Sequence, residues 1–149
     1  MDERDTPEQL KARALRYLVR REHSRAELAR KLAPHADSPA AVAELLDQLL
    51  SRKQQSDARY AEERARVLSR KYGAAKIRHD LRSKGIADAV VAAVTSEGEL
   101  ERARAILERK YRAPAVSREE RAKRARFLQG RGFSSEVIVR LVLDRDEAP

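Results

Sequence analysis

The amino-acid sequence predicts an all-α protein built as an elongated array of three tandem three-helix repeats. Alanine, leucine, arginine, lysine and glutamate, which all favour helices, dominate its 149 residues, and no run shows the sustained alternation of a strand. A short segment over residues 80–86 recurs over residues 127–133, at a fixed offset of 47 residues. Such an offset is typical of stacked copies of one helical unit. The matched pairs are Leu81 with Leu128, Gly85 with Gly132, and Ile86 with Phe133.

Composition and charge narrow the class of protein. The chain carries 33 basic and 24 acidic side chains, which gives a net charge of +9 and favours polyanions or acidic protein surfaces as partners. Cysteine is absent from the sequence, which excludes disulfides and thiolate metal sites. The longest apolar run, residues 89–94, is far shorter than the roughly 20 residues of a membrane span. The N-terminus is acidic and polar, unlike a signal peptide, so we expect a cytoplasmic protein.

Three helices are expected in the first repeat, residues 1–55, which is the most diverged copy. Each begins after a serine or threonine that can accept a hydrogen bond from the free N–H groups of the first turn. These N-caps are Thr6, Ser24 and Ser38, and the first two are joined by Gln9 and Glu27 in capping boxes. The first helix should end near Arg20, and Pro34 should stop the second. The residues predicted to face the core are Leu10, Ala14, Tyr17, Leu18, Leu28, Leu32, Val42, Leu45, Leu46 and Leu49.

The second repeat is expected over residues 56–98. Its first helix should begin at Ser56 or Asp57 and extend to Tyr72, with a break at Gly73. A second helix should close at Gly85, which is suited to a left-handed cap, and a third should run over residues 88–95. The predicted inner positions are Tyr60, Ala61, Ala65, Leu68, Tyr72, Ile77, Leu81, Ile86, Ala89, Val90, Ala93 and Val94.

The third repeat, residues 99–149, ends in a short charged tail from Asp144. Its helices should begin near Glu99, after Ser117 and after Ser134, and Ser117 should form a capping box with Glu120. The predicted inner positions are Leu100, Ala103, Ile106, Leu107, Ala125, Leu128, Val137, Ile138 and Leu141, with Phe127 beside them.

Basic side chains of the second and third repeats are the candidate binding residues. Arg78 and Arg82 are four residues apart and therefore share a helix face, which can contact phosphates or a carboxylate-rich groove. The basic segments are not interleaved with exposed aromatic residues, which favours phosphate or acidic-surface contacts over base stacking. The alternative, a solvated face neutralised by neighbouring acids, stays open. The candidates are Arg70, Lys71, Lys76, Arg78, Arg82, Lys84, Arg121, Lys123, Arg124, Arg126 and Arg131.

Several short motifs follow one another in a definite order along the chain. They are residues 14–18 (ALRYL), 21–28 (REHSRAEL), 31–32 (KL), 57–61 (DARYA), 72–73 (YG), 84–86 (KGI), 126–128 (RFL) and 131–133 (RGF). In this order and spacing the sequence resembles the RecX family, bacterial regulators of the RecA recombinase. The resemblance covers roughly residues 10–143 and departs from the family at Ser56, where a second acidic residue is common.

The resemblance implies a non-enzymatic negative regulator. It would bind the RecA–DNA filament and inhibit its ATP hydrolysis and strand exchange, in DNA repair, homologous recombination and the SOS response. Binding to single- and double-stranded DNA, largely independent of sequence, is also implied, and we expect a monomer without cofactor, metal or membrane contact. His23, His35 and His79 have no spacing typical of a metal or catalytic site, and the chain lacks a phosphate-binding glycine loop.

A helix-turn-helix protein that binds a specific DNA sequence is the alternative, because residues 24–50 resemble the opening of such a motif. Two features disfavour it. The connection from Pro34 to Ser38 is longer than the usual three or four residues. The helix after it is acidic and apolar, with no side chains suited to reading bases.

Overall fold

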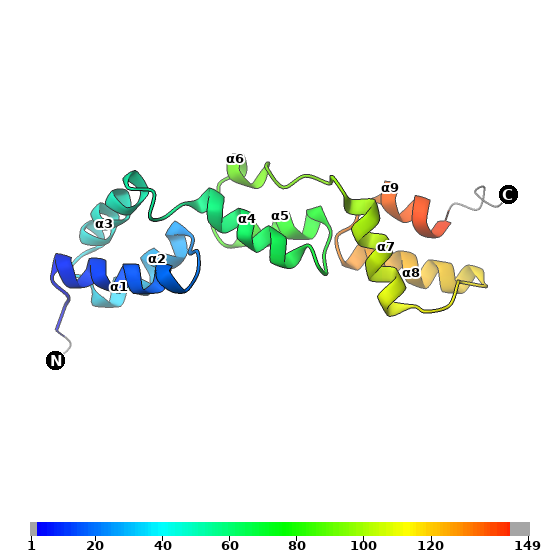
Figure 1. Cartoon of the computed structure of the whole chain (residues 1–149), viewed down its shortest axis with the longest axis horizontal. Coiled ribbons are helices and arrows are strands. Elements are labelled where there is room, and N and C mark those ends of the chain that lie inside the picture. Colours follow the sequence, from blue (N-terminus) through cyan, green and yellow to red (C-terminus); the bar gives the residue numbers. More distant parts are fainter. Residues whose placement is uncertain (1–2, 144–149) are drawn as a thin grey trace. The chain divides into compact units, whose positions relative to one another are not determined.

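The structure, a computed structural model, describes residues 3–143, and within this range every regular element is a helix (Figure 1). The elements are α1 (Pro7–Arg20), α2 (Arg25–Leu32), the 3-10 helix η1 (Ala33–His35), α3 (Pro39–Ser51), α4 (Asp57–Leu68), α5 (Ala74–Ser83), α6 (Asp88–Val91), α7 (Glu99–Lys110), α8 (Arg118–Gly130), α9 (Ser135–Ile138) and the π-helical η2 (Val139–Leu143). The predicted all-α class is confirmed. The charged tail predicted from Asp144 lies outside the described residues.

The described residues form two compact units. The first unit contains residues 3–63 and Arg82–Val90, and the second contains Arg64–Leu81 and residues 91–143. The division passes through α4 and α5, so the middle of the chain contributes to the interior of both units. The repeat boundaries placed after residues 55 and 98 stay predictions.

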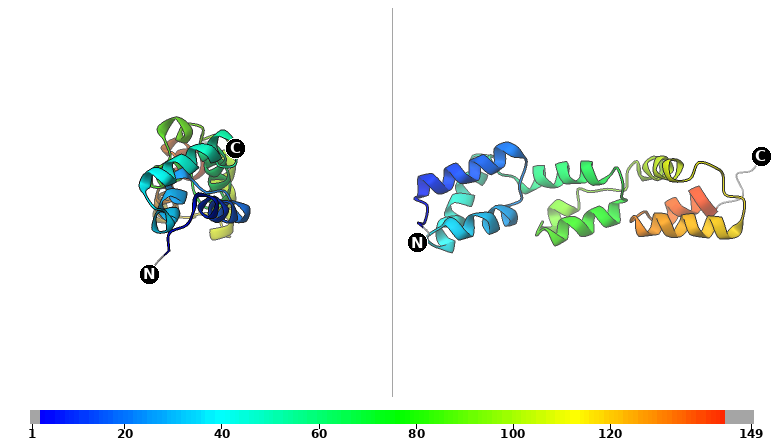
Figure 2. Two further views of the ribbon diagram at one scale, coloured as in Figure 1. Left: turned by 90° about the vertical axis from the view of Figure 1, so that its left-hand side faces the viewer. Right: turned by 90° about the horizontal axis from the view of Figure 1, so that it is seen from below.

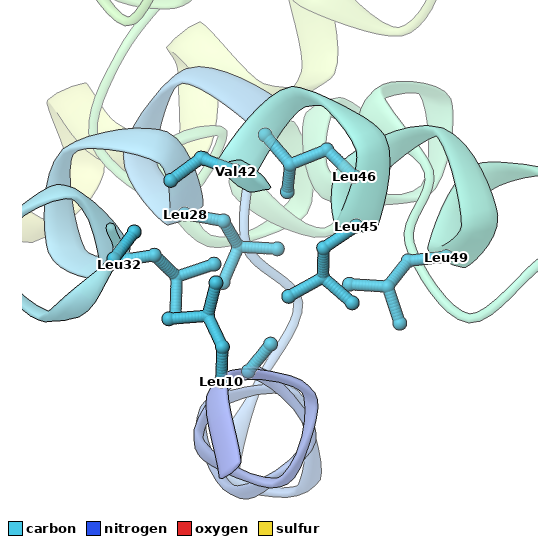
Figure 3. Close-up of a cluster of buried hydrophobic side chains, with 9 residues drawn as sticks. Leu10, Leu28, Leu32, Val42, Leu45, Leu46 and Leu49 are labelled. Carbon is cyan, nitrogen blue, oxygen red and sulfur yellow. The ribbon is translucent and has the colours of Figure 1, made fainter. Parts of the chain in front are cut away.

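Helices α1, α2 and α3 enclose the apolar core of the first unit (Figure 3). Its members are Leu10, Ala14, Leu28, Leu32, Ala36, Val42, Leu45, Leu46 and Leu49. All of them except Ala36 were predicted from the helical spacing, and Tyr17 and Leu18 pack against the same core while staying half-buried. Since each fully buried leucine contributes about 2 kcal/mol, this cluster is the main stabilising element of the unit.

The predicted N-caps of these three helices are in place, with one difference. Thr6 and Gln9 form a complete capping box, and the Ser38 hydroxyl accepts from the N–H of Ala41. The Ser24 hydroxyl likewise accepts from the Glu27 N–H. The Glu27 carboxylate, however, does not complete the box, because the Arg21 guanidinium binds it at 2.6 Å.

Helices α7, α8 and α9 and segment η2 form the core of the second unit, and Figure 2 shows α8 and α9 side by side. The core consists of Ala103, Ile106, Leu128, Phe133, Val137, Ile138 and Val142. Val142 was not predicted. The π-helical winding of η2 puts more residues into each turn than an α-helix does, so Val142 is buried and Leu141 only half-buried.

Two helices are shorter than predicted. Helix α4 ends at Leu68 because the N–H groups of Lys71 and Tyr72 both donate to the Leu68 carbonyl and close the last turn. Tyr72 therefore lies in a turn and is half-buried, as Ala65 and Leu68 also are, whereas Tyr60 and Ala61 are buried as predicted.

Helix α6 ends at Val91 instead of reaching residue 95. A helix of a single turn cannot place all the predicted inner positions of this segment on one buried side. Val91 is buried, and Ala89 and Ala93 are exposed, so the prediction that these two alanines face inward was wrong. Among the described residues no helix has the length and apolar character needed to cross a membrane.

Candidate functional site

The turn after α4 docks against the end of α8 within the second unit. The Gly73 N–H donates to the Arg131 carbonyl at 2.7 Å, and the Lys76 ammonium donates to the Gly130 carbonyl at 3.1 Å. The two backbones approach so closely that a Cβ on Gly73 would lie 2.4 Å from the Gly132 carbonyl oxygen. Gly132 itself has a φ of 89°, which favours glycine. This docking holds the turn beside Arg131.

Five cationic side chains surround one depression of about 510 Å³ in the second unit. Arg70 and Lys71 lie in the turn after α4, and Arg109 and Lys110 lie in the last turn of α7. Arg131 directly follows the end of α8. Ile106 and Phe127 complete the lining. We call this feature the cationic depression, defined by Arg70, Lys71, Arg109, Lys110 and Arg131.

Aromatic rings lie among these cations. The Lys110 ammonium is 4.8 Å and the Arg131 guanidinium 5.0 Å from the centre of the Phe127 ring. Arg131 also lies over the Tyr72 ring, at 5.4 Å. The sequence predicted that no exposed aromatic residues lie among the basic segments, and none of these rings is fully exposed. The rings are half-buried, and cations lie over their faces.

On helix α8, outside the cationic depression, another cation also lies over an aromatic ring. The Arg124 guanidinium lies 4.5 Å from the centre of the Tyr111 ring and donates to the Ala113 carbonyl at 2.7 Å. Tyr111 in turn meets Phe127 edge to face, with the ring centres 6.0 Å apart. The arginines and lysines here are thus positioned by rings and carbonyl groups.

The positive charges of the cationic depression are not neutralised by carboxylates of the described residues. None of its lining residues is acidic, and none of its five cations forms an ion pair there. Elsewhere arginines are paired: Arg64 contacts Asp80 at 2.9 Å, and Arg104 contacts Glu101 at 3.1 Å on the same helix as Arg109. The depression is therefore a concentrated region of positive potential.

The remaining predicted binding residues lie at separate places. Arg78 is half-buried and donates to the Val94 carbonyl at 2.7 Å, and Lys76 lies over the Tyr72 ring. Arg82 and Lys84 belong to the first unit, where Arg82 contacts Asp88 at 3.4 Å. Arg121 lines another hollow with Arg118. Lys123 and Arg126 are exposed on α8.

Sequence reasoning placed Arg70, Lys71 and Arg131 among the candidates but missed Arg109 and Lys110. The signal that could have identified them is a short basic segment with an aromatic residue inside it, Arg109-Lys110-Tyr111-Arg112. Its proximity to Arg70 arises only from the fold, since the Arg109 guanidinium donates to the Arg70 carbonyl at 2.9 Å.

A second polar cluster lies in the first unit around the buried side chain of His23. Its Nδ1 lies 3.0 Å from the Arg21 carbonyl and its Nε2 3.0 Å from the Lys31 ammonium. Both contacts are satisfied by a neutral ring that donates from Nδ1 and accepts at Nε2. Burial lowers the pKa of His23, and the hydrogen bond from Arg21 lowers the pKa of Glu27 to about 2.

Two carboxylates cap helices that precede them in the chain. Asp57, the first residue of α4, accepts from the Arg25 N–H at the start of α2, at 2.8 Å. Glu99, the first residue of α7, accepts from the Ala74 N–H at the start of α5, at 2.9 Å. Ser56 was singled out in the sequence as a departure from the family pattern. Its hydroxyl accepts a hydrogen bond from the Arg59 N–H and so caps the start of α4.

Comparison with known protein families covers most of the chain. The models of the first, second and third three-helix domains of RecX match residues 11–49, 56–94 and 97–142. The chain belongs to the RecX family. The resemblance drawn from the short motifs is confirmed.

Relatives named regulatory protein RecX are similar to this chain along most of their length. "Regulatory protein RecX" of Leptothrix cholodnii is 48% identical over 134 residues, which is 87% of this chain and 84% of the relative. That of Ralstonia nicotianae is 43% identical, with 94% and 90% covered. The crystal structure of RecX from Lactobacillus salivarius has a TM-score of 0.81 at 22% identity, with 95% and 97% covered, and so shows the same fold.

Proposed function

We propose that this RecX-family protein is a negative regulator of the RecA recombinase. It binds the RecA–DNA filament through its basic residues and inhibits the ATPase and strand-exchange activities of RecA. The observation that carries the proposal is the cationic depression, five positive charges without carboxylate partners among the described residues. A filament wound around DNA is a long array of negative charge, and such a surface attracts it over several ångströms.

Binding, and not catalysis, is the activity that these residues support. The groups that line the cationic depression are arginines, lysines and apolar side chains, which supply attraction and hydrogen-bond donors but neither a general base nor a nucleophile at neutral pH. We propose a monomer that acts in the cytoplasm and binds single- and double-stranded DNA with little dependence on sequence.

The deciding experiment measures DNA-dependent ATP hydrolysis by RecA while this protein is titrated into preformed filaments. The rate should fall to a low plateau. An unchanged rate at saturating protein would refute the proposal. Repeating the titration with excess single-stranded DNA is the control, because a protein that merely removes DNA from RecA would then lose its effect.

Helix α3 gives little support to the alternative, a helix-turn-helix protein that reads one DNA sequence. Val42, Leu45 and Leu46 are buried in the core, and the exposed side carries Glu44 and Asp47, which phosphates repel. The two functions differ in a simple measurement. A strong preference for one short duplex over random duplexes would favour the alternative.

A further inference from the structure

We propose that the cationic depression is a binding site for the backbone phosphates of nucleic acid, and that it contacts DNA and not RecA itself. This inference rests on the proposed function and deepens it, because it names the part of the filament that the site recognises. The site consists of Arg70, Lys71, Arg109, Lys110 and Arg131 around Phe127.

The gathering of like charges around one hollow favours a strand of phosphates. Five cations line one hollow, and no acidic side chain lies among its lining residues. Mutual repulsion between such groups is relieved when an anion binds between them. A nucleic-acid strand offers one negative charge about every 3.4 Å, a density that a folded protein surface seldom reaches without basic residues in between.

Two of the arginines are held in place before any ligand arrives. The Arg109 guanidinium uses one of its five N–H groups on the Arg70 carbonyl, at 2.9 Å. Arg131 lies over both Phe127 and Tyr72, with 5.0 and 5.4 Å to the ring centres. Contact through the face of a guanidinium leaves the N–H groups at its edge available, and this edge matches the two oxygens of a phosphate.

The same contacts argue against stacking of bases. Lys110 and Arg131 lie over the Phe127 ring, and Arg124 lies over Tyr111. A base stacks on a ring only where that ring presents a free face. The site should therefore bind homopolymers of different bases alike.

The test measures binding of fluorescein-labelled oligo-dT by anisotropy over a range of salt concentrations, without RecA. For single strands the slope of log affinity against log salt changes by about 0.7 for each lost phosphate contact. The double variant Arg109→Gln/Lys110→Gln should therefore lower the steepness by about 1.4. Lys71→Gln, on a different segment, should lower it by about 0.7.

Arg104→Gln is the matched control. It removes a positive charge from the same helix as Arg109, but one that already pairs with Glu101 at 3.1 Å. Its salt dependence should equal that of the unmodified protein. Helix content by circular dichroism confirms that each variant is folded.

The outcomes separate this site from the proposed function. The site is refuted when the double variant and Lys71→Gln bind oligo-dT with unchanged steepness. It is also refuted when they bind DNA normally but no longer inhibit RecA, since the depression would then contact the recombinase. Loss of DNA binding in these variants, together with an unmodified protein that leaves RecA hydrolysis unchanged, would support the site and reject the regulator.

Discussion

The backbone N–H of Gly73 donates a hydrogen bond of 2.7 Å to the carbonyl oxygen of Arg131. The two residues are far apart in the chain, and each belongs to a short motif of the RecX resemblance, residues 72–73 and 131–133. Their contact fixes the turn after α4 against the end of α8 and brings Arg70 to Arg109. A feature typical of the family thus has a structural role, and through it the cationic depression is assembled.

Gly73→Ala should lower the free energy of unfolding by about 1–3 kcal/mol, the usual cost of forcing atoms into a filled space. The added Cβ would lie 2.4 Å from the Gly132 carbonyl oxygen, which is backbone and cannot turn away. Gly130→Ala is the control, since its Cβ would meet nothing within 4 Å. Urea unfolding followed by circular dichroism measures both, and equal stability of the two variants would contradict the prediction.

Arg78→Glu should destabilise the protein by about 1–3 kcal/mol, whereas Arg82→Glu should cost less than about 1 kcal/mol. Arg78 is half-buried and donates to the Val94 carbonyl, which a glutamate would repel. Arg82 and its partner Asp88 have 55% and 90% of their side chains exposed. Thermal unfolding of the two single variants distinguishes them, and a larger loss in Arg82→Glu would show that the assignment of roles is wrong.

Asp57→Ala should destabilise the first unit by about 1–2 kcal/mol, the cost of a lost helix cap. Its carboxylate accepts from the Arg25 N–H and from the Gln55 side chain, and both donors would lose their acceptor. Asp88→Ala removes a carboxylate of the same type from an exposed position and should change stability little. The comparison uses urea midpoints, and the prediction fails when both variants have the same midpoint.

The stability of the first unit should fall as the pH drops from about 7 to 5, because of His23. The folded state lowers the pKa of this ring below its ordinary 6.5, mainly through burial, so in this window the unfolded chain binds more protons. The charged groups that face the ring are Arg21, Glu27 and Lys31, with Tyr17 packed beside it. Protonation would place a second positive charge 3.0 Å from the Lys31 ammonium.

His23→Gln should remove that part of the pH dependence while keeping a neutral polar side chain. Glu27 does not interfere with this measurement. Because its pKa is lowered to about 2, its contribution to the stability is fully present above about pH 4.5 and is lost only as the pH falls towards 2. Urea unfolding of both proteins at several pH values from about 7 to 5 provides the measurement. Parallel curves would show that another group is responsible.

The shape of the whole chain is open to an independent measurement. A compact protein of 149 residues has a radius of gyration of about 15 Å. Three repeats arranged in a line, as the sequence predicts, should give a clearly larger value in solution scattering. A value near 15 Å would reject the elongated arrangement.

Local features of the fold were accessible from the sequence because they depend on neighbouring residues. The cap at Thr6 and the stripe through Leu45 and Leu49 follow from helix geometry alone. The binding residues were harder to predict from the sequence, since Arg109 and Lys110 come close to Arg70 only through the docking of distant backbones. Periodicity also fails where a helix has one turn or changes its winding, as α6 and η2 do.

The caps supplied by Asp57 and Glu99 bear on how the molecule can be divided. A piece that stops at residue 55 would leave the Arg25 N–H without its acceptor, and one that stops at residue 98 would do the same to Ala74. The first and second repeats therefore each depend for one helix cap on the first helix of the next repeat. A repeat swapped between relatives should be more stable when the donor segment also carries the carboxylate at the start of the next repeat's first helix.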